Sequence, residues 1–317
     1  MKFIETLREG DQIGGVYLCK SRQSATSKTG RPYENVTLQD RTGNLDCKIW
    51  EPNSTGIEEF GPLDYIYVVG EVTNFQNNLQ LNIKRVRVAK SDEYRPEDYL
   101  PVSEKDSAAM YAELMEFLDS VQNKWLRQLI DKYFRDPSFE KAFSQHSAAK
   151  TIHHSFVSGL LEHTLSVVKM CDLYYRLYPY LNHDLLITAA AFHDVGKLKE
   201  ISNFPVNDYT DDGQLLGHIV MGSELIGYAC RTIQGFPHRL MSELQHCILA
   251  HHGELEYGSP KKPALAEALA LHLADNTDAR LELMREILGS ASKLKSADEW
   301  LGFNRLLESN VRRTGAW

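Results

Sequence analysis

The stretch AFHDVGK, residues 191–197, closes an apolar run that begins at Leu185 and decides how the second half of the chain folds. Neighbouring residues of a helix point about 100° apart, so His193 and Asp194 continue the apolar face and point into the protein. A buried carboxylate is costly unless a partner satisfies it, and a divalent cation would bind both side chains. A buried hydrogen bond between His193 and Asp194 is the structural alternative.

Two further polar residues lie on apolar helical stripes. His163 lies on the apolar face of GLLEHTLSVVKM, residues 159–170, and Asp275 ends the apolar stripe of PALAEALALHLAD, residues 263–275. A single histidine in such a place is more often satisfied by a backbone carbonyl than by a metal. Together with the His193–Asp194 pair, however, these residues form a mixed nitrogen and oxygen set on separate helices. Such a set suits Mn²⁺, Fe²⁺, Zn²⁺ or Mg²⁺.

The N-terminal part alternates apolar and polar residues as β-strands do. In LDCKIW, residues 45–50, for example, every second side chain is apolar. The last strand changes phase after Ile83, which predicts a β-bulge near Lys84 and Arg85. Five short strands favour a small OB-type barrel. We expect these strands at residues 14–22, 33–40, 44–50, 64–73 and 78–88.

We therefore predict a multidomain chain, with an all-β OB-type domain before an all-α domain. The segment between them is charged and contains Pro96 and Pro101. It shows neither the alternation of a strand nor the apolar stripe of a helix, which is typical of a linker. The predicted limits are 1–90 for the barrel, 91–106 for the linker and 107–317 for the helical domain.

Composition excludes several classes of protein. The net charge of −8 argues against a protein that coats nucleic acid through bulk positive charge. No apolar run reaches the roughly 18 residues that a membrane span needs, so we expect no membrane contact and a location in the cytoplasm. The five cysteines are far apart and never form a CxxC pair, which predicts buried thiols and no disulfide framework.

The order His163, His193–Asp194 and Asp275 resembles the H…HD…D signature of the HD phosphohydrolase superfamily. The chain is also similar, over nearly its whole length, to the YhaM family of 3′-to-5′ exoribonucleases, which join an OB-type domain to an HD domain. Besides the barrel, this resemblance rests on three segments: HHSFVSGLLEHTLSV (153–167), LLGHIVMGSELI (215–226) and ILAHHGELEYGSPKKPALAEALALHLADNTDA (248–279).

The resemblance implies a first metal ion held by the four residues of the signature. It implies a second ion bridged by Asp194 and held by His218 and His251, with His252 as a further candidate. By itself the sequence leaves these histidines open, since His218 could cap a helix and the paired histidines could face a cleft or water. Of the possible divalent ions we expect manganese first, with magnesium, iron or zinc as alternatives.

Candidate substrate contacts come from both domains. Lys197 is a candidate catalytic residue that contacts phosphate, and an ion pair with Asp194 is its alternative role. His154, with its neighbour His153, is a candidate to line the path of the substrate phosphates. The alternative is that these histidines only pack within a loop. OB barrels bind single strands by stacking bases on aromatic side chains while cations follow the backbone. The barrel candidates are Tyr33, Lys48, Trp50 and Arg85, which Lys28, Arg31, Lys84 and Arg87 could extend.

These features predict a metal-dependent 3′-to-5′ exonuclease that degrades single-stranded RNA, with Asp194 and Lys197 at the reacting phosphate. The direction and the preference for RNA follow from the resemblance, and activity on DNA and homo-oligomer formation stay open. One alternative is an HD nucleotidase that acts on mononucleotides or signalling nucleotides. Another is a nucleic-acid-binding factor without catalytic activity.

Overall fold

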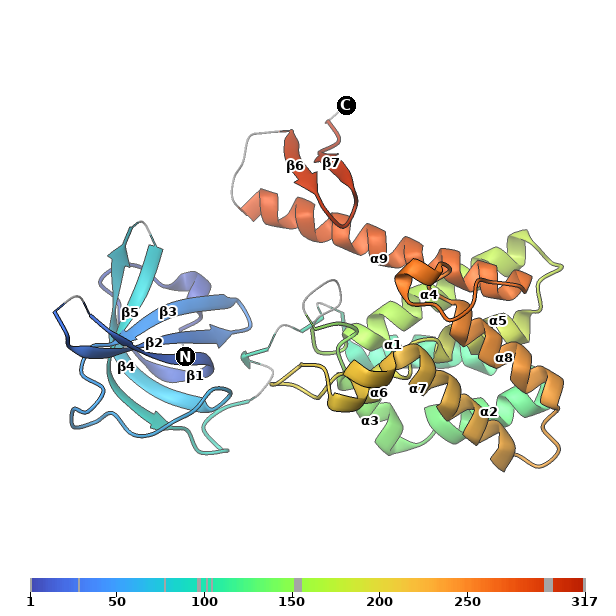
Figure 1. The fold of residues 1–317 in the computed structure, drawn as a ribbon, viewed down its shortest axis with the longest axis horizontal. Helices are drawn as coiled ribbons and strands as arrows, with labels where there is room; N and C mark the ends of the chain where they lie inside the picture. Colours follow the sequence, from blue (N-terminus) through green and yellow to red (C-terminus); the bar gives the residue numbers. More distant parts are fainter. Residues whose placement is uncertain are drawn as a thin grey trace. The chain divides into compact units, whose positions relative to one another are not determined.

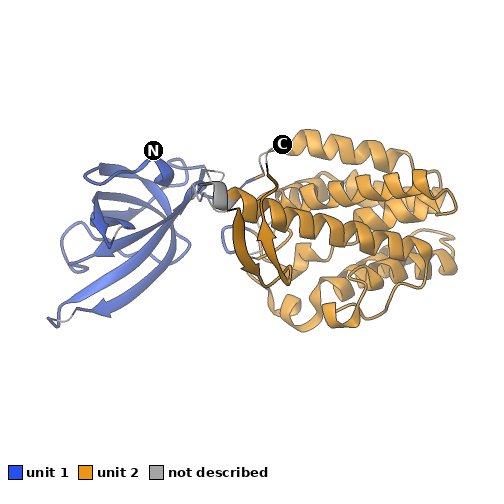
Figure 2. Cartoon of the chain, turned by 90° about the horizontal axis from the view of Figure 1, so that it is seen from above, with its two compact units in different colours: residues 1–102, 204–206 blue, residues 103–203, 207–317 orange. Residues whose placement is uncertain are grey.

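The computed structural model describes residues 2–27, 29–76, 78–95, 98–100, 102–103, 105–150, 156–293 and 299–315. The chain forms two compact units, residues 1–102 with 204–206 and residues 103–203 with 207–317 (Figure 2). The first unit therefore contains part of the expected linker, 91–106. The domain limits 1–90, 91–106 and 107–317 stay a prediction.

The first unit is a closed barrel of five strands in the order β1-β2-β3-β5-β4 (Figure 1). Strands β3 and β5 pair in parallel, and the other neighbours pair antiparallel. This confirms the predicted OB-type barrel, with a first strand longer than expected. The elements are η1 (Ile4–Thr6), β1 (Gln12–Thr26), β2 (Pro32–Asp40), β3 (Gly43–Ile49), β4 (Tyr65–Phe75) and β5 (Asn78–Val88).

The alternation in the sequence matches the two faces of the barrel wall. Leu45, Cys47 and Ile49 of β3 are buried in the barrel core. The predicted bulge is confirmed as well, because Val69 pairs with Arg85 whereas Gly70 pairs with Ile83, so that Lys84 between them has no partner on β4.

The second unit is helical, with a short β-hairpin near its C-terminal end that the sequence did not predict. None of the described helices is both long and apolar enough to cross a bilayer. All five cysteines of the chain are buried free thiols, as predicted. The helices are α1 (Ser107–Asp119), α2 (Lys124–Phe134), α3 (Pro137–Gln145), α4 (Gly159–Leu177), α5 (His183–Phe192), α6 (Lys197–Glu200), α7 (Asp211–Thr232), α8 (His238–Ala250), η3 (Leu255–Tyr257) and α9 (Ala266–Lys293), and the hairpin strands are β6 (Trp300–Asn304) and β7 (Ser309–Arg312).

Helix α5 lies at the centre of this unit, because every residue from Leu185 to Phe192 is buried. Asn182 caps its first turn, with its side-chain oxygen accepting a hydrogen bond from the backbone N–H of Leu185 at 3.1 Å. The helix runs directly into His193, so the apolar run carries the motif into the interior, as the sequence indicated.

Glycines allow α6 and α7 to meet directly behind the motif. A Cβ atom on Gly196 would lie 2.0 Å from the carbonyl oxygen of His218, so only glycine fits this contact. Gly217 has a φ of 75° and ψ of 156°, which breaks the helical path of α7 just before His218. Together these two positions set where the His218 ring lies relative to Asp194.

The variant Gly196→Ala should lower the free energy of unfolding by about 1–3 kcal/mol, because its methyl group clashes with backbone that cannot easily move. Chemical denaturation followed by circular dichroism measures this loss. Gly289→Ala is the matched control, since Gly289 lies in α9 with no heavy atom within 4 Å of its would-be Cβ. This control should be neutral or stabilising by about 0.5–1 kcal/mol, and equal losses in both variants would contradict the proposed contact.

Candidate metal centre

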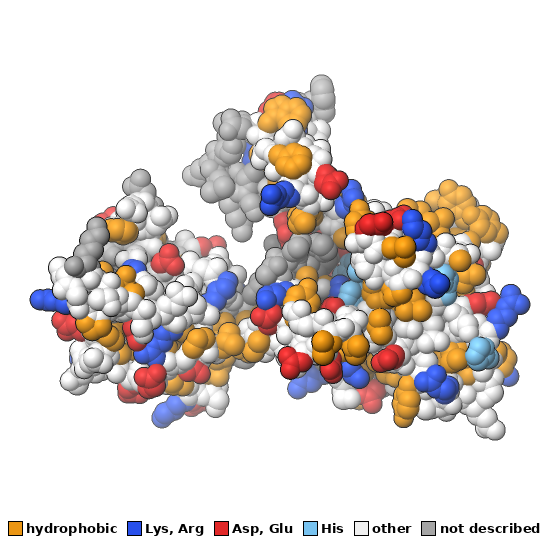
Figure 3. Space-filling view, viewed as in Figure 1, with side chains coloured by type: hydrophobic (Ala, Val, Ile, Leu, Met, Phe, Trp, Pro, Cys, Tyr) orange, Lys and Arg blue, Asp and Glu red, His pale blue; other side chains and the backbone are white. Residues whose placement is uncertain are grey.

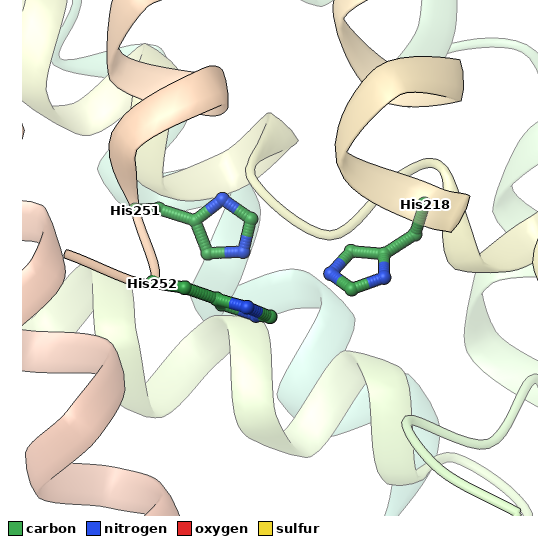
Figure 4. A group of neighbouring side chains, drawn as sticks. All are labelled: His218, His251 and His252. Atoms are coloured by element: carbon green, nitrogen blue, oxygen red, sulfur yellow. The ribbon is translucent and has the colours of Figure 1, made fainter. Parts of the chain in front are cut away.

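Two groups of potential metal ligands lie side by side in the helical unit. His163 of α4, His193 at the end of α5 and Asp275 of α9 place their ligand atoms within 4.8 Å of one another. The second group consists of His218, His251 and His252, whose ligand atoms also lie within 4.8 Å of one another. Figure 4 shows the second group, in which His218 comes from α7 and the paired histidines from the end of α8.

Asp194 lies between the two groups and directs one oxygen at each. Its Oδ2 is 3.4 Å from Nε2 of His163 and 3.4 Å from Nε2 of His193. Its Oδ1 is 3.4 Å from Nε2 of His218 and 3.7 Å from Nε2 of His251. The carboxylate is therefore placed as a bridge would be.

Backbone carbonyls fix the orientation of three of the imidazole rings. The Nδ1 atom lies 2.8 Å from the oxygen of Ala190 in His193, 2.7 Å from that of Ile248 in His251 and 2.8 Å from that of Tyr257 in His252. A carbonyl only accepts hydrogen bonds, so in each neutral ring Nδ1 carries the proton and Nε2 keeps its lone pair. All three lone pairs are thus available to a cation.

Carboxylates play the same part for the other two rings. Nδ1 of His163 lies 2.7 Å from Oδ2 of Asp278, and Nδ1 of His218 lies 2.9 Å from Oε1 of Glu200. Sequence reasoning missed both acids. A signal existed for Asp278, which follows Asp275 by one helical turn, but nothing in the sequence distinguishes Glu200 from a solvent-exposed glutamate.

The unsatisfied atoms of the centre fit a divalent cation. Oδ1 of Asp194 and Nε2 of His218 and of His251 are buried, and none of them makes a hydrogen bond within the described part of the chain. Nε2 of His163 and Nε2 of His193, by contrast, lie 3.1 Å apart as a hydrogen bond, with one proton between them that a bound cation would replace. Buried polar groups left in this way are strongly unfavourable, and a bound metal ion would satisfy them.

The protonation of the histidines follows their surroundings. Burial, reinforced by His252 and His193, lowers the pKa of His251 well below its usual value, and burial likewise lowers the pKa of His252. Both rings are therefore neutral near pH 7 and able to ligate. At His163 burial opposes the charge, but the carboxylates of Asp275 and Asp278 prevail and raise its pKa to about 10.

Lys197 forms the ion pair that was its alternative role. Its Nζ lies 2.6 Å from Oδ2 of Asp194. Burial opposes ionisation of both groups, yet their mutual attraction raises the pKa of Lys197 and lowers the pKa of Asp194 well below its usual value. Asp194 is therefore an anion whose charge is available to cations.

A cavity of about 430 Å³ opens beside the centre and is lined by members of both ligand groups. Figure 3 shows a recess in this unit with histidine atoms, drawn in pale blue, visible inside it. The lining residues are Ala148, His163, Lys197, His252, Tyr257, His272, Asp275, Asn276, Ala279, Arg280, Leu283, Arg305, Leu306 and Glu308.

On the barrel, the structure brings three of the four expected contact residues together. The rings of Tyr33 and Trp50 lie 5.2 Å apart between centroids, and Nζ of Lys48 lies 5.0 Å from the centroid of Tyr33. Trp50 is 52% exposed and lines a hollow of about 330 Å³ together with Arg31.

The remaining candidates are placed differently. Arg85 is exposed on β5 and packs against Gly56, outside that hollow. Lys84 is paired with Glu71 at 3.2 Å, and Arg87 with Glu93 at 2.7 Å. Three candidates lie outside the described residues: Lys28, His153 and His154.

The sequence and the fold were compared with those of known proteins. Residues 160–280 match the HD domain family. The second OB-fold domain of replication protein A from Methanococcus maripaludis is 17% identical and covers 28% of this chain and 95% of its own, with a TM-score of 0.23. The assignment of the barrel therefore rests on the strand order of this chain itself.

Curated relatives extend over most of the sequence. The 3′-5′ exoribonuclease YhaM of Geobacillus sp. (strain WCH70) is 33% identical over 280 residues, which cover 88% of this chain and 86% of the relative. The protein of the same name from Bacillus subtilis (strain 168) is 31% identical, with 88% of each chain covered. The chain therefore belongs to the YhaM family, whose named members are 3′-5′ exoribonucleases.

Proposed function

We propose that this protein is a divalent-metal-dependent exonuclease that removes nucleotides from the 3′ end of single-stranded RNA. The observation that carries the proposal is Asp194, whose two carboxylate oxygens are directed at two separate groups of histidines. Membership of a family whose relatives are named 3′-5′ exoribonucleases supports the direction and the substrate.

The proposed ligands divide between two ions, with Asp194 shared. His163, His193 and Asp275 would hold one ion, and His218 and His251, with His252 as a further ligand, the other. When bound, two such ions neutralise a phosphodiester and lower the pKa of a water molecule towards 7. We propose manganese first, with magnesium, iron or zinc as alternatives, because a site of imidazole and carboxylate ligands suits all four.

The chain itself supplies orientation and charge. Hydrogen bonds from Nδ1 hold the histidine rings so that every Nε2 points to the centre. We propose that Lys197 has two roles: it keeps Asp194 ionised, and it places a positive charge at the cavity where a substrate phosphate would lie. Asp194 and Lys197 are thus the proposed catalytic residues.

We propose that the Tyr33–Trp50 pair and Lys48 bind the RNA strand by stacking and by attraction to the backbone. Arg85 and His154 remain candidate contacts elsewhere along the strand. This surface favours a polymer over the nucleotidase alternative, since a mononucleotide needs no second unit with exposed stacking aromatics. We further propose a location in the cytoplasm. Activity on DNA and assembly into a homo-oligomer are separate questions, which need their own experiments.

The variant Asp194→Asn should lose both bound metal and RNA degradation, because the proposed bridge loses its charge. Metal content by inductively coupled plasma mass spectrometry and the decay of 5′-end-labelled RNA on gels measure the two effects. Asp212→Asn, an exposed aspartate on α7, is the control and should behave as wild type. Full activity of Asp194→Asn would favour a function without metal catalysis, and cleavage of nucleoside phosphates alone would favour the nucleotidase.

The variant Asp278→Asn should weaken metal binding by about tenfold to a hundredfold, because the charge that orients His163 is removed while the shape is kept. Calorimetric titration of the metal-free protein with Mn²⁺ measures this change. Glu282→Gln, one turn further along α9, is the control, since Glu282 pairs with Arg285 and belongs to neither ligand group. Unchanged affinity for Mn²⁺ in Asp278→Asn would show that this carboxylate does not position the ligand.

The variant Trp50→Ala should weaken binding of single-stranded RNA by about 1–3 kcal/mol, the value of one stacked base. Fluorescence anisotropy with labelled RNA measures the change, and hydrolysis of bis(p-nitrophenyl) phosphate should stay as in wild type. Phe75→Ala removes another exposed aromatic ring of the barrel and serves as control. Equal losses in both variants would argue against a specific stacking role for Trp50.

A further inference from the structure

The C-terminal hairpin lies outside the region that matches the HD family, yet it contributes to the cavity beside the metal centre. The family match ends at residue 280, whereas β6 begins at Trp300. The turn between the hairpin strands lines the same cavity as His163, His252 and Asp275, through Arg305, Leu306 and Glu308. The hairpin therefore forms one wall of the site.

Two arginines, Arg305 of the hairpin turn and Arg280 of α9, bring positive charge to the cavity. Arg305 is exposed and makes no ion pair or hydrogen bond with any residue that the structure describes. Arg280 donates from Nε to Oδ1 of Asn276 at 3.1 Å, and its other guanidinium donors have no partner within the described part of the chain. Apart from the proposed ligands and Lys197, the charged residues that line the cavity are Arg280, Arg305 and Glu308. Two positive charges therefore face one negative charge. Arginine pairs with phosphate through two parallel hydrogen bonds.

Arg280 and Asp275 both line this cavity from α9. Arg280 follows Asp275 by five residues, which is about 7.5 Å along the helix axis and about 140° around it. The two side chains therefore reach the cavity at separate points, so a strand with one phosphate beside Asp275 has a second cationic contact available at Arg280.

An aromatic ring completes the cavity. Tyr257 lines it beside His252, is 62% exposed and accepts the Nδ1 hydrogen bond of His252 through its own carbonyl. An exposed ring at such a place can stack on a base. The volume of about 430 Å³ lies within the range of roughly 300–1,000 Å³ typical of small-ligand pockets, and it suits one nucleotide.

We propose that this cavity is the subsite for the nucleotide immediately upstream of the scissile phosphate. Arg305 and Arg280 bind the 5′-phosphate of that nucleotide, and Tyr257 stacks on its base. The hairpin is thus a substrate-positioning element in which Arg305 is the phosphate-binding residue. This inference rests on the proposed exonuclease function, because it assumes that the scissile phosphate lies at the metal centre.

The test compares two RNA oligonucleotides of the same sequence, loaded on the full-length, metal-bound protein. One carries only phosphates, and the other carries a neutral methylphosphonate at the linkage next to the 3′-terminal one. The terminal linkage itself is unmodified in both. Release of the first nucleotide is timed in single-turnover reactions for wild type, Arg305→Ala and Arg312→Ala. Arg312 is the matched control, since it lies on the same hairpin and pairs with Glu299 away from the cavity.

Wild type should release the first nucleotide about tenfold faster from the all-phosphate RNA, the loss expected for one charge-assisted contact. Arg305→Ala should release it more slowly and with a clearly smaller ratio between the two RNAs, because Arg280 alone then contacts this phosphate, and Arg312→Ala should keep the wild-type ratio. Equal rates in wild type, or an unchanged ratio in Arg305→Ala, would overturn the subsite. No release from either RNA by metal-bound wild type would instead overturn the proposed function as well. Circular dichroism of Arg305→Ala checks that the variant folds.

Discussion

Burial of the Asp194 carboxylate is the constraint on which the helical unit depends. A charge in an apolar interior is tolerated only when other groups satisfy it, and here Lys197 and four neighbouring imidazoles gather around it. The apolar helix α5 delivers the carboxylate to the centre, and the close contact at Gly196 brings α7 within reach. The packing of α6 against α7 and the position of the ligand His218 therefore depend on the same residue, Gly196 of the AFHDVGK motif.

Much of this arrangement could be predicted because the ligands lie on regular periods. His163, His193 and Asp275 continue apolar helical stripes, and such stripes converge in a core, so their sequence spacing alone indicates a common site. The same reasoning located the barrel strands and the bulge at Lys84, where a change of phase is visible in the sequence. Periodicity indicates which face of a helix or strand a residue occupies. For these positions, knowing the face was enough to predict that the side chains are directed into the core.

The residues that could not be predicted depend on other physical facts. Glu200 and Asp278 act through single hydrogen bonds to histidine rings, which leave no periodic signal. The hairpin escaped notice because Trp300 and Phe303 are largely exposed, so its strands lack the buried alternation by which strands are recognised. The paired histidines are oriented by the carbonyl of Ile248 in the last turn of α8 and by that of Tyr257 in η3, and sequence periodicity does not indicate either contact. Lys197, finally, forms the ion pair with Asp194, and its contact with phosphate stays a prediction.

The closure of the barrel limits how anything can bind to it. Every strand of the closed sheet has two neighbours, and where both ladders run its backbone N–H and C=O groups are already paired. The ladder between β3 and β5 is short, however, because it joins only residues 46–48 to residues 80–82. Where both ladders run, a partner cannot add a strand as many peptide ligands do, and recognition there must use side chains that project from the wall. Its specificity can then change by substituting those side chains while the backbone scaffold stays the same.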